Sequence, residues 1–477
     1  MEETVVLYPS PHVGHLVSMV ELGKLLLTHR PALSIHIFIA AAPYIAGRTD
    51  KYISTVSASV PSIKFRHLPI VTPASTAATP LEVLTLEILH FIKPRVHEEL
   101  INISKTFKIH GLIMDFFCTS GLSVADEIHI PSYFFITSGA CFLALYLHLP
   151  TLHQNTTKSF KDMKEHFLNV PGLLPVLATD MPKPFLERDN KAYQYFLDFS
   201  TQVPQAAGIM INTFEFLESK VVRAISDGLC VPDNPTPPIY CIGPLILADD
   251  KRGGSSKTSP EDAYKCITWL DSQPNQSVVF LCFGSLGLFT KEQLREIATG
   301  LEKSGQRFLW VVRDPPSHNL SVAIKANGYP DLDSLLPDGF LERTKERGLV
   351  MKLWAPQVEI LNHSSVGGFV THCGWNSILE AVCAGVPLVA WPLYAEQRLN
   401  RAVLVEEMKL ALSMNESEDG FVSADEVEKN LRGFMESDEG KLIRERAIAM
   451  KNAAKAAMIE GGSSHVAPLS KLVESWN

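Results

Sequence analysis

The sequence predicts an α/β protein that folds into two lobes with a central cleft between them. Short apolar runs rich in β-branched residues alternate with helical patterns from the N-terminus onward, and this alternation is typical of βα units with parallel sheets. A polar segment interrupts the alternation after residue 245, and a second βα series follows it. The length of 477 residues is too great for one ordinary core and suits two domains of ~200–250 residues each.

The N-terminal domain is expected to span residues 1–245. Five apolar residues after the first strand recur at helical spacing, so the domain begins with a strand, a loop over residues 9–15 and a helix. These residues are Leu16, Met19, Val20, Leu22 and Leu26. The expected strands cover residues 5–8, 34–40, 63–67, 112–117, 133–137 and 209–212.

The C-terminal domain is expected over residues 263–459, after a linker over 246–262 that is rich in Gly, Ser and charge. A helix is expected to begin at Lys291, and helices follow from about Ala424 to the end. The segment 314–336, which has little periodicity, is expected to be a mobile surface loop. The expected strands cover residues 278–283, 308–312, 350–354, 368–371 and 386–391.

Composition excludes several classes of function. The net charge of −9 argues against nucleic acid or an anionic membrane as partner. The N-terminus lacks the basic and apolar regions of a signal peptide, and the most apolar stretch, residues 130–150, contains polar residues, so a cytoplasmic chain with no stable membrane association is expected. The eight cysteines lack CxxC spacing and are expected to be reduced and mostly buried, without metal.

The 44 residues from 354 to 397 carry the strongest functional signal. They begin with Trp354, continue through an apolar strand into a turn that opens a helix near Gly374, and end with the pair Glu396 and Gln397. A planar base can stack on the tryptophan, and a diphosphate can bind the unpaired N–H groups at the helix start. The carboxylate of Glu396 and the amide of Gln397 can then bind the hydroxyls of a sugar. The pattern predicts a nucleotide-sugar site.

This segment resembles the signature box of the plant secondary-product UDP-glycosyltransferases, the family 1 enzymes of the GT-B fold, and the PSPHVGH of residues 9–15 is similar to the family's PSPGxGH. The resemblance implies two Rossmann-like domains, the first for the acceptor and the second for the UDP-sugar. It implies that the C-terminal helix, about 460–477, packs back on the N-terminal domain. A monomer without metal or other cofactor is expected, with UDP-glucose as donor substrate.

His15 and Asp115 are the expected catalytic pair. Each lies at or just beyond the carboxyl end of a predicted strand, where open α/β sheets bind their ligands. An isolated histidine there is more often a core or helix-start residue, but the pair Gly14 and His15 matches the family's general base. An imidazole can take a proton from a hydroxyl at neutral pH, and a carboxylate on its other nitrogen fixes the tautomer.

The resemblance also implies which residues bind the UDP-sugar. Relatives that use glucuronate have an arginine where this chain has Trp375, and galactose users often have histidine at the position of Gln397, so UDP-glucose is the expected donor. The implied contacts are Trp354, Ala355 and Gln357 for the base or ribose, Glu380 for the ribose, Ser285, His372, Gly374, Asn376 and Ser377 for the diphosphate, and Trp375, Glu396 and Gln397 for the sugar.

The acceptor site is marked by less specific signals. His12 stands where the family usually has glycine, and its ring either projects toward the substrates or points to solvent. Several aromatic residues suggest the walls of a pocket for a planar phenol. The alternative is that they belong to the core. They are Phe116, Phe117, Phe134, Phe135, Phe142 and Tyr146. The Asp331 and Asp333 pair resembles a metal-binding Asp-x-Asp but is expected to be solvated surface.

We therefore expect an inverting glucosyltransferase that acts on small phenolics, similar to the branch that glucosylates chalcones, dihydrochalcones and isoflavonoids. C-glycosylation of the same acceptors remains an alternative. A second alternative is a non-catalytic protein that binds nucleotide sugars or phenolics on the same fold. A third, a Rossmann oxidoreductase, lacks a GxGxxG turn after either leading strand.

Overall fold

The computed structural model describes residues 1–42, 49–71, 79–246, 260–316, 330–459, 461–464, 467–474 and 476. The chain divides into two compact units. The first contains Met1–Ser255 and Ala454–Asn477, and the second contains Ser256–Ala453. The boundary near residue 453 falls inside helix α18 (Asp438–Met458). Most of the expected linker, residues 247–259, lies outside the described residues.

The first unit is built on a seven-stranded parallel sheet with the strand order β3-β2-β1-β4-β5-β8-β9. The order reverses between β1 and β4, and ligands of such sheets bind at the carboxyl ends of the strands at this switch point. The strands are β1 Glu2–Tyr8, β2 Ser34–Ile39, β3 Ile63–His67, β4 Phe107–Asp115, β5 Ser132–Ile136, β8 Gly208–Ile211 and β9 Ile239–Cys241.

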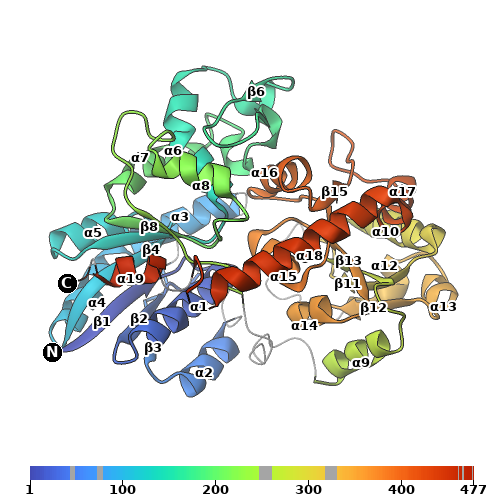
Figure 1. Cartoon of the computed structure of the whole chain (residues 1–477), viewed down its shortest axis with the longest axis horizontal. Helices are drawn as coiled ribbons and strands as arrows, with labels where there is room; N and C mark the ends of the chain where they lie inside the picture. Colours follow the sequence, from blue (N-terminus) through green and yellow to red (C-terminus); the bar gives the residue numbers. More distant parts are fainter. Residues whose placement is uncertain are drawn as a thin grey trace. The chain divides into compact units, whose positions relative to one another are not determined.

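Helices pack on both faces of this sheet (Figure 1). A small antiparallel hairpin, β6 (Phe167–Leu168) and β7 (Val176–Leu177), stands apart from it. The last helix, α19, contacts α1 and β9, and Trp476 stacks on His110 of β4 with ring centroids 5.8 Å apart. The helices are α1 Val13–His29, α2 Asp50–Ser59, α3 Leu81–Phe91, α4 Lys93–Ser104, α5 Gly121–Glu127, α6 Ala140–Gln154, α7 Lys191–Gln202, α8 Ser219–Ser226 and α19 Ala467–Glu474.

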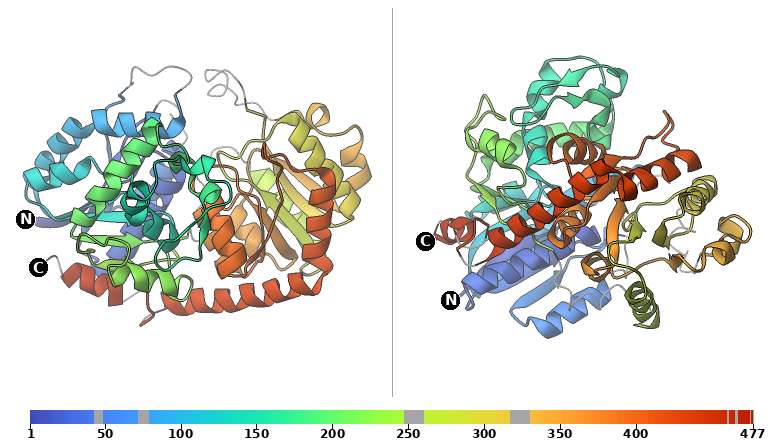
Figure 2. Two further views of the ribbon diagram at one scale, coloured as in Figure 1. Left: turned by 90° about the horizontal axis from the view of Figure 1, so that it is seen from above. Right: turned by 45° about the vertical axis from the view of Figure 1, so that its right-hand side comes forward.

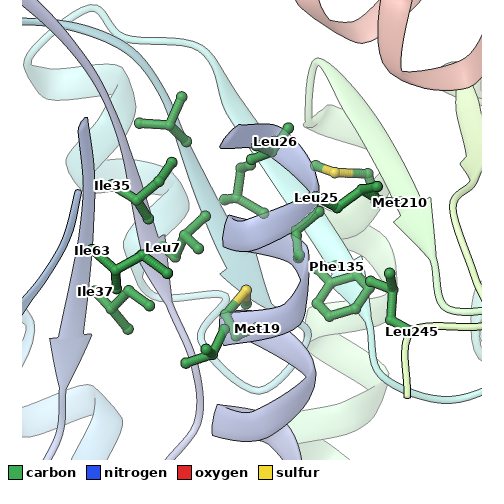
Figure 3. Close-up of a cluster of buried hydrophobic side chains, with 14 of the residues drawn as sticks. Leu7, Met19, Leu25, Leu26, Ile35, Ile37, Ile63, Phe135, Met210 and Leu245 are labelled. Carbon is green, nitrogen blue, oxygen red and sulfur yellow. The ribbon is translucent and has the colours of Figure 1, made fainter. Parts of the chain in front are cut away.

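Helix α1 supplies the centre of the core of the first unit. Its apolar residues recur every three or four positions, so they share the faces that pack on the sheet. Met19 and Leu26 belong to one cluster with aliphatic side chains from β1, β2 and β3, and Leu25 lies beside Met210 of β8 (Figure 3). Leu7 and Ile35 also press close to Gly23, where glycine lets the helix approach the strands. This packing holds the loop before α1 at the carboxyl end of β1.

The second unit repeats this architecture with a six-stranded parallel sheet in the order β12-β11-β10-β13-β14-β15. Its switch point lies between β10 and β13, and helices cover both faces (Figure 2). The strands are β10 Val278–Cys282, β11 Arg307–Val312, β12 Gly348–Lys352, β13 Val366–Thr371, β14 Leu388–Ala390 and β15 Ala411–Ser413. The longer helices are α9 Pro260–Asp271, α10 Lys291–Ser304, α15 Trp375–Ala384, α17 Ala424–Glu436 and α18; shorter ones are α12 Leu332–Leu335, α13 Phe340–Thr344, α14 Gln357–Asn362 and α16 Gln397–Ala402.

Local capping explains why α10 begins where the sequence predicts. The Thr290 side chain accepts a hydrogen bond from the Gln293 N–H, and Gly305 follows the last turn with φ of 70°. The first is a standard start signal of a helix, and the second is a standard stop signal. The predicted start at Lys291 is confirmed.

Two expectations about local structure were wrong, and two short strands were not foreseen. The short strands β9 and β15 were not predicted, because three residues carry too little pattern to be recognised. The strand expected over 350–354 lies at 348–352, since the positive φ of Leu353 ends it. The expected loop over 314–336 contains helix α12, and its residues 317–329 lie outside the described residues.

The apolar stretch 130–150 forms β5 and most of α6. Among the described helices, none combines the length and apolar character needed to cross a membrane. All eight cysteines belong to the described residues and carry free thiols; six are buried and two, Cys282 and Cys383, are partly exposed.

Replacing Leu26 with alanine tests the role of α1 in the core. This side chain is fully buried, so Leu26→Ala should lower the free energy of unfolding by about 2–5 kcal/mol, through lost burial and the cavity left behind. The matched control is Leu229→Ala in the same unit, where the side chain is 55% exposed and the loss should stay within about 0.5 kcal/mol. Denaturant unfolding followed by circular dichroism measures both; equal losses would contradict this view of the core.

Candidate active site

The first cluster of candidate residues lies at the switch point of the first sheet. His15 is in the first turn of α1, directly after the loop that follows β1, and Asp115 is the last residue of β4. The His15 Nδ1 and Asp115 Oδ2 atoms are 2.6 Å apart. Asp115 is fully buried, whereas the His15 side chain is 23% exposed. The two residues that the sequence singles out, 100 positions apart, are therefore in hydrogen-bond contact.

The orientation of Asp115 is fixed from both of its oxygens. Oδ2 accepts from His15, and Oδ1 accepts the Phe117 N–H at 3.0 Å. A carboxylate held in this way keeps the proton of the imidazole on Nδ1 and leaves the lone pair on Nε2. This is the tautomer that a proton acceptor at Nε2 requires.

Thr137 is a third member of this cluster that sequence reasoning missed. It follows β5, the strand beside β4, and its Oγ1 atom lies 2.9 Å from His15 Nδ1. The hydroxyl is therefore a second neighbour of the nitrogen that faces Asp115. Strand-end placement was the available signal, because Thr137 is the last residue of the strand expected over 133–137.

His12 is placed beside the pair and does not point away from the protein. Its ring centroid lies 5.5 Å from that of His15 and 5.9 Å from that of Phe117. Burial, with a smaller contribution from His15, lowers the pKa of His12 to about 3. Although part of its surface stays accessible, the ring is thus neutral at physiological pH, and it lies beside the rings of His15 and Phe117.

An aromatic cluster adjoins His15. Phe116 and Phe117 have ring centroids 4.6 Å apart, and both lie within 6 Å of the His15 ring. Phe142 packs on Phe116 and stacks on Tyr146, and sequence reasoning missed two further members of the cluster, Phe185 and Phe196. Phe117 is the partly exposed member of the pair that flanks His15.

Two aromatic residues considered for this site belong elsewhere. Phe135 lies in the core beside α1 (Figure 3), and Phe134 is fully buried within β5. Successive residues of a strand point to opposite faces of its sheet, so both are buried by the helices that cover the two faces. The sequence pattern alone does not separate such core residues from a pocket wall.

Glu218 holds the start of α6, the helix that carries Phe142 and Tyr146. The carboxylate is buried and accepts the Ala140 and Cys141 N–H groups, each at 2.8 Å. The helix has no cap from its own N-cap residue, so a residue 77 positions along the chain from Cys141 satisfies the N–H groups that every helix start leaves unpaired. This contact fixes the aromatic wall relative to the sheet.

The second cluster lies at the switch point of the second sheet. The turn after β13 reaches Cys373 with φ of 64°, and α15 then begins after Gly374. Asn400, which sequence reasoning did not identify, donates to the Cys373 carbonyl at 2.9 Å and holds this turn. The first N–H groups of α15 have no intrahelical acceptor and favour an anion at this position.

His372 is held between two glycines. A Cβ atom on Gly284 or on Gly374 would lie 2.6 Å or 2.5 Å from its Nε2 atom. Only residues without a side chain allow both backbone turns to approach the ring so closely. Burial lowers the pKa of His372 to about 4, so the ring is neutral near pH 7 and can donate one hydrogen bond.

A buried polar group joins α14 to α15. The Gln357 amide donates to Ser377 Oγ at 3.0 Å and to Glu380 Oε2 at 2.6 Å. All three side chains are buried, and the contact brings together three of the predicted residues.

The remaining predicted residues of this unit surround the same sheet edge. The Gln397 Oε1 atom accepts the Leu393 and Tyr394 N–H groups, both at 2.9 Å, and the Gln397 side chain is buried and also hydrogen-bonds the Tyr394 side chain. Glu396 is the N-cap of α16. Ala355 and Trp375 are buried, Trp354, Asn376 and Glu396 are partly exposed, and Ser285 is exposed in the turn after β10.

Asp331 and Asp333 are exposed, as predicted, although Asp333 belongs to α12 and not to a loop. Within the described residues there is no group of three His, Cys, Asp or Glu side chains placed to hold a metal ion. The two clusters therefore offer a proton acceptor beside aromatic rings and a set of neutral donors suited to an anion.

The chain matches the family model described as UDP-glucoronosyl and UDP-glucosyl transferase over residues 96–441. It is 48% identical to the UDP-glycosyltransferase 88B1 of Stevia rebaudiana over 99% of this chain and 98% of that protein. It is 47% identical to an anthocyanidin 5,3-O-glucosyltransferase of a Rosa hybrid cultivar, over 99% of both proteins. It is 46% identical to a phloretin 2'-O-glucosyltransferase of Malus domestica, over 97% of this chain and 98% of that protein.

Solved structures show the same architecture. The Phytolacca americana UGT2 complexed with UDP-2fluoro-glucose and pterostilbene has a TM-score of 0.86 and 36% identity, over 99% of each chain. The Medicago truncatula UGT71G1 complexed with UDP-glucose has a TM-score of 0.86 and 35% identity, over 100% of this chain and 98% of that one. The predicted GT-B fold class is confirmed.

Gly374→Ala tests the packing around His372. The backbone conformation of Gly374 suits any residue, so the effect comes from the contact of the new Cβ with the imidazole. We expect a loss of about 1–3 kcal/mol in the free energy of unfolding. The control, Gly433→Ala in α17, has open space around the new Cβ and should be neutral or stabilising by up to about 1 kcal/mol. Thermal and denaturant unfolding compare the two, and equal effects would contradict the packing described.

Proposed function

Because the chain belongs to the family of UDP-glucuronosyl and UDP-glucosyl transferases, we propose that it moves glucose from UDP-glucose to a hydroxyl of a small phenolic acceptor of the flavonoid type. The observation that carries this proposal is the 2.6 Å contact between His15 and Asp115. In this proposal the first unit provides the general base and the second unit binds the donor.

His15 acts as the general base. With its proton held on Nδ1 by Asp115, Nε2 takes the proton of the acceptor hydroxyl as the oxygen attacks the anomeric carbon of glucose. The buried carboxylate stabilises the imidazolium that forms. Attack from the side opposite the leaving UDP inverts the anomeric centre through an oxocarbenium-like transition state.

The donor is bound without metal. Ser285, His372, Asn376, Ser377 and the backbone at Gly374 contact the diphosphate in this proposal, and the start of α15 stabilises the negative charge that grows on the leaving UDP. The base and ribose are assigned to Trp354, Ala355, Gln357 and Glu380. Glucose hydroxyls are assigned to Trp375, Glu396 and the amide of Gln397.

The acceptor is a planar phenol bound beside His15. Support comes from the rings of Phe116, Phe117 and Phe142 next to the base. Two relatives are named for glucosylating anthocyanidin and phloretin, and one solved neighbour was complexed with pterostilbene. His12, neutral and half-buried, contributes a second imidazole to the acceptor side.

The base assignment predicts a large loss of turnover in His15→Ala. General-base catalysis typically contributes 10²–10⁴-fold, so kcat should fall by about that factor while the affinity for UDP is retained. Asp115→Asn should also lower kcat, because an amide neither stabilises the imidazolium nor fixes the proton on Nδ1. The matched control is His29→Ala at the other end of the same helix, with kcat unchanged. Single-turnover assays with UDP-glucose measure this, and wild-type turnover in His15→Ala would refute the assignment.

A wild-type protein that binds UDP-glucose but never transfers its sugar would favour a non-catalytic binding protein.

The donor assignment predicts a specific effect of Gln397→Glu. A carboxylate still accepts the Leu393 and Tyr394 N–H groups but cannot donate to a sugar hydroxyl. We expect kcat/KM for UDP-glucose to fall by about 10–100-fold, which corresponds to losing a buried hydrogen bond and leaving its partner unpaired. Affinity for UDP, which lacks the glucose group, is the control and should change little.

Wild-type enzyme should prefer UDP-glucose to UDP-glucuronate, and the opposite preference would overturn the choice of sugar.

A further inference from the structure

The turn of residues 284–286, directly after β10, is held from behind by an arginine of the neighbouring strand. Arg313 follows the last residue of β11, which pairs with β10 along its length. Its Nη1 atom donates to the Gly284 carbonyl at 3.3 Å and also to the Ser285 carbonyl. A guanidinium is always charged and has donors in a fixed plane, so one side chain holds two successive carbonyls.

This contact decides where the N–H groups of the turn point. In a trans peptide the C=O and N–H bonds point in opposite directions. With the Gly284 and Ser285 carbonyls directed to Arg313, the N–H groups of Ser285 and Leu286 are directed away from it. Neither N–H group has a hydrogen-bond acceptor among the described residues, and both residues are exposed. Two adjacent N–H groups are therefore open to a ligand.

The same turn is part of the anion-binding cluster. Gly284 has φ of 69° and lies against the Nε2 edge of His372. Gly374, at the start of α15, lies against the same nitrogen. The two turns at the switch point thus meet at one imidazole, and successive backbone N–H groups in such turns bind anions.

We propose that Arg313 is a positioning residue for the donor diphosphate, which it serves by holding the carbonyls of the 284–286 turn so that the N–H groups of Ser285 and Leu286 face the phosphate oxygens. This inference rests on the proposed UDP-sugar donor and adds to it a residue outside the 354–397 segment. Arg313 does not touch the ligand in this arrangement and acts through the backbone of the turn.

A competing role for Arg313 is direct contact with a charged group of the donor. Its charge reaches Tyr394, whose pKa is raised to about 12 mainly by burial and is lowered slightly by Arg313. Tyr394 lies in the loop whose N–H groups Gln397 accepts. A test must therefore separate a hydrogen-bonding role toward the turn from a charge directed at the phosphates or sugar.

Three substitutions make this separation. Arg313→Met removes both the charge and the hydrogen bonds. Arg313→Gln keeps an amide that can donate to a carbonyl, and Arg313→Lys keeps the charge without the planar donors. The matched control is Arg307→Met at the opposite end of β11, where the guanidinium donates to Gln273. Circular dichroism and thermal midpoints confirm folding for each variant.

Calorimetric titration with UDP and with uridine gives the decisive readout. We expect Arg313→Met to weaken UDP binding by about 10–100-fold, while uridine, which has no phosphate, binds as in the wild type. Arg313→Gln should recover part of the loss and exceed Arg313→Lys, and Arg307→Met should bind both ligands normally. The salt dependence of UDP affinity should match the wild type in Arg313→Met, since no charge on the ligand loses a partner.

Other outcomes overturn the inference. Equal weakening of UDP and uridine would show a purely structural role. Recovery by lysine but not by glutamine, with a reduced salt dependence, would show direct electrostatic contact with the phosphates. Unchanged UDP affinity in Arg313→Met would remove any role. A wild-type protein that does not bind UDP would refute the proposed donor itself, which is a distinct failure.

Discussion

The hydrogen bond between His15 and Asp115 is the contact on which the proposed chemistry depends. It joins the start of α1, the helix that follows β1, to the end of β4, the strand beside β1. The two residues are 100 positions apart in the chain. The core beneath α1 keeps the histidine at the carboxyl end of β1, and the Phe117 N–H keeps the carboxylate turned toward it. Because the carboxylate is fully buried, its charge acts on the imidazole with little screening by water. The fold thus fixes the position of both side chains of the pair.

The second unit uses the same topology for a different purpose. Its switch point presents backbone N–H groups and a neutral His372 in place of a base, and two glycines allow the backbone to approach that ring. In both units, groups assigned to the proposed substrates are held in place by residues that hydrogen-bond to the backbone near them. Glu218 binds the start of α6, Asn400 binds the turn before α15, and Arg313 binds the turn after β10. The proposed sites therefore depend on residues that hold the backbone as well as on residues that contact the ligand.

Much of this organisation could be predicted from the sequence, and the exceptions have physical reasons. The strands, the helix at Lys291 and the 354–397 segment carry strong local patterns of apolar spacing and capping. Asn400 and Arg313 carry none, and Thr137 carries only its place at a strand end, because each acts through a contact with a residue distant in the sequence that only the fold brings near. Aromatic residues show the same limit: Phe135 and Phe142 look alike in the sequence, yet one belongs to the core beside α1 and the other to the cluster that adjoins His15.

The proposed chemistry requires that Asp115 hold His15 as the neutral tautomer with its proton on Nδ1. Nuclear magnetic resonance of protein labelled with ¹⁵N in the histidine rings tests it directly, with His15→Ala used to identify the signals. At neutral pH the account predicts a protonated Nδ1 and an unprotonated Nε2 for His15, with the Nδ1 proton signal displaced in Asp115→Asn. A His15 ring with its proton on Nε2, or one unaffected by Asp115→Asn, would contradict the account.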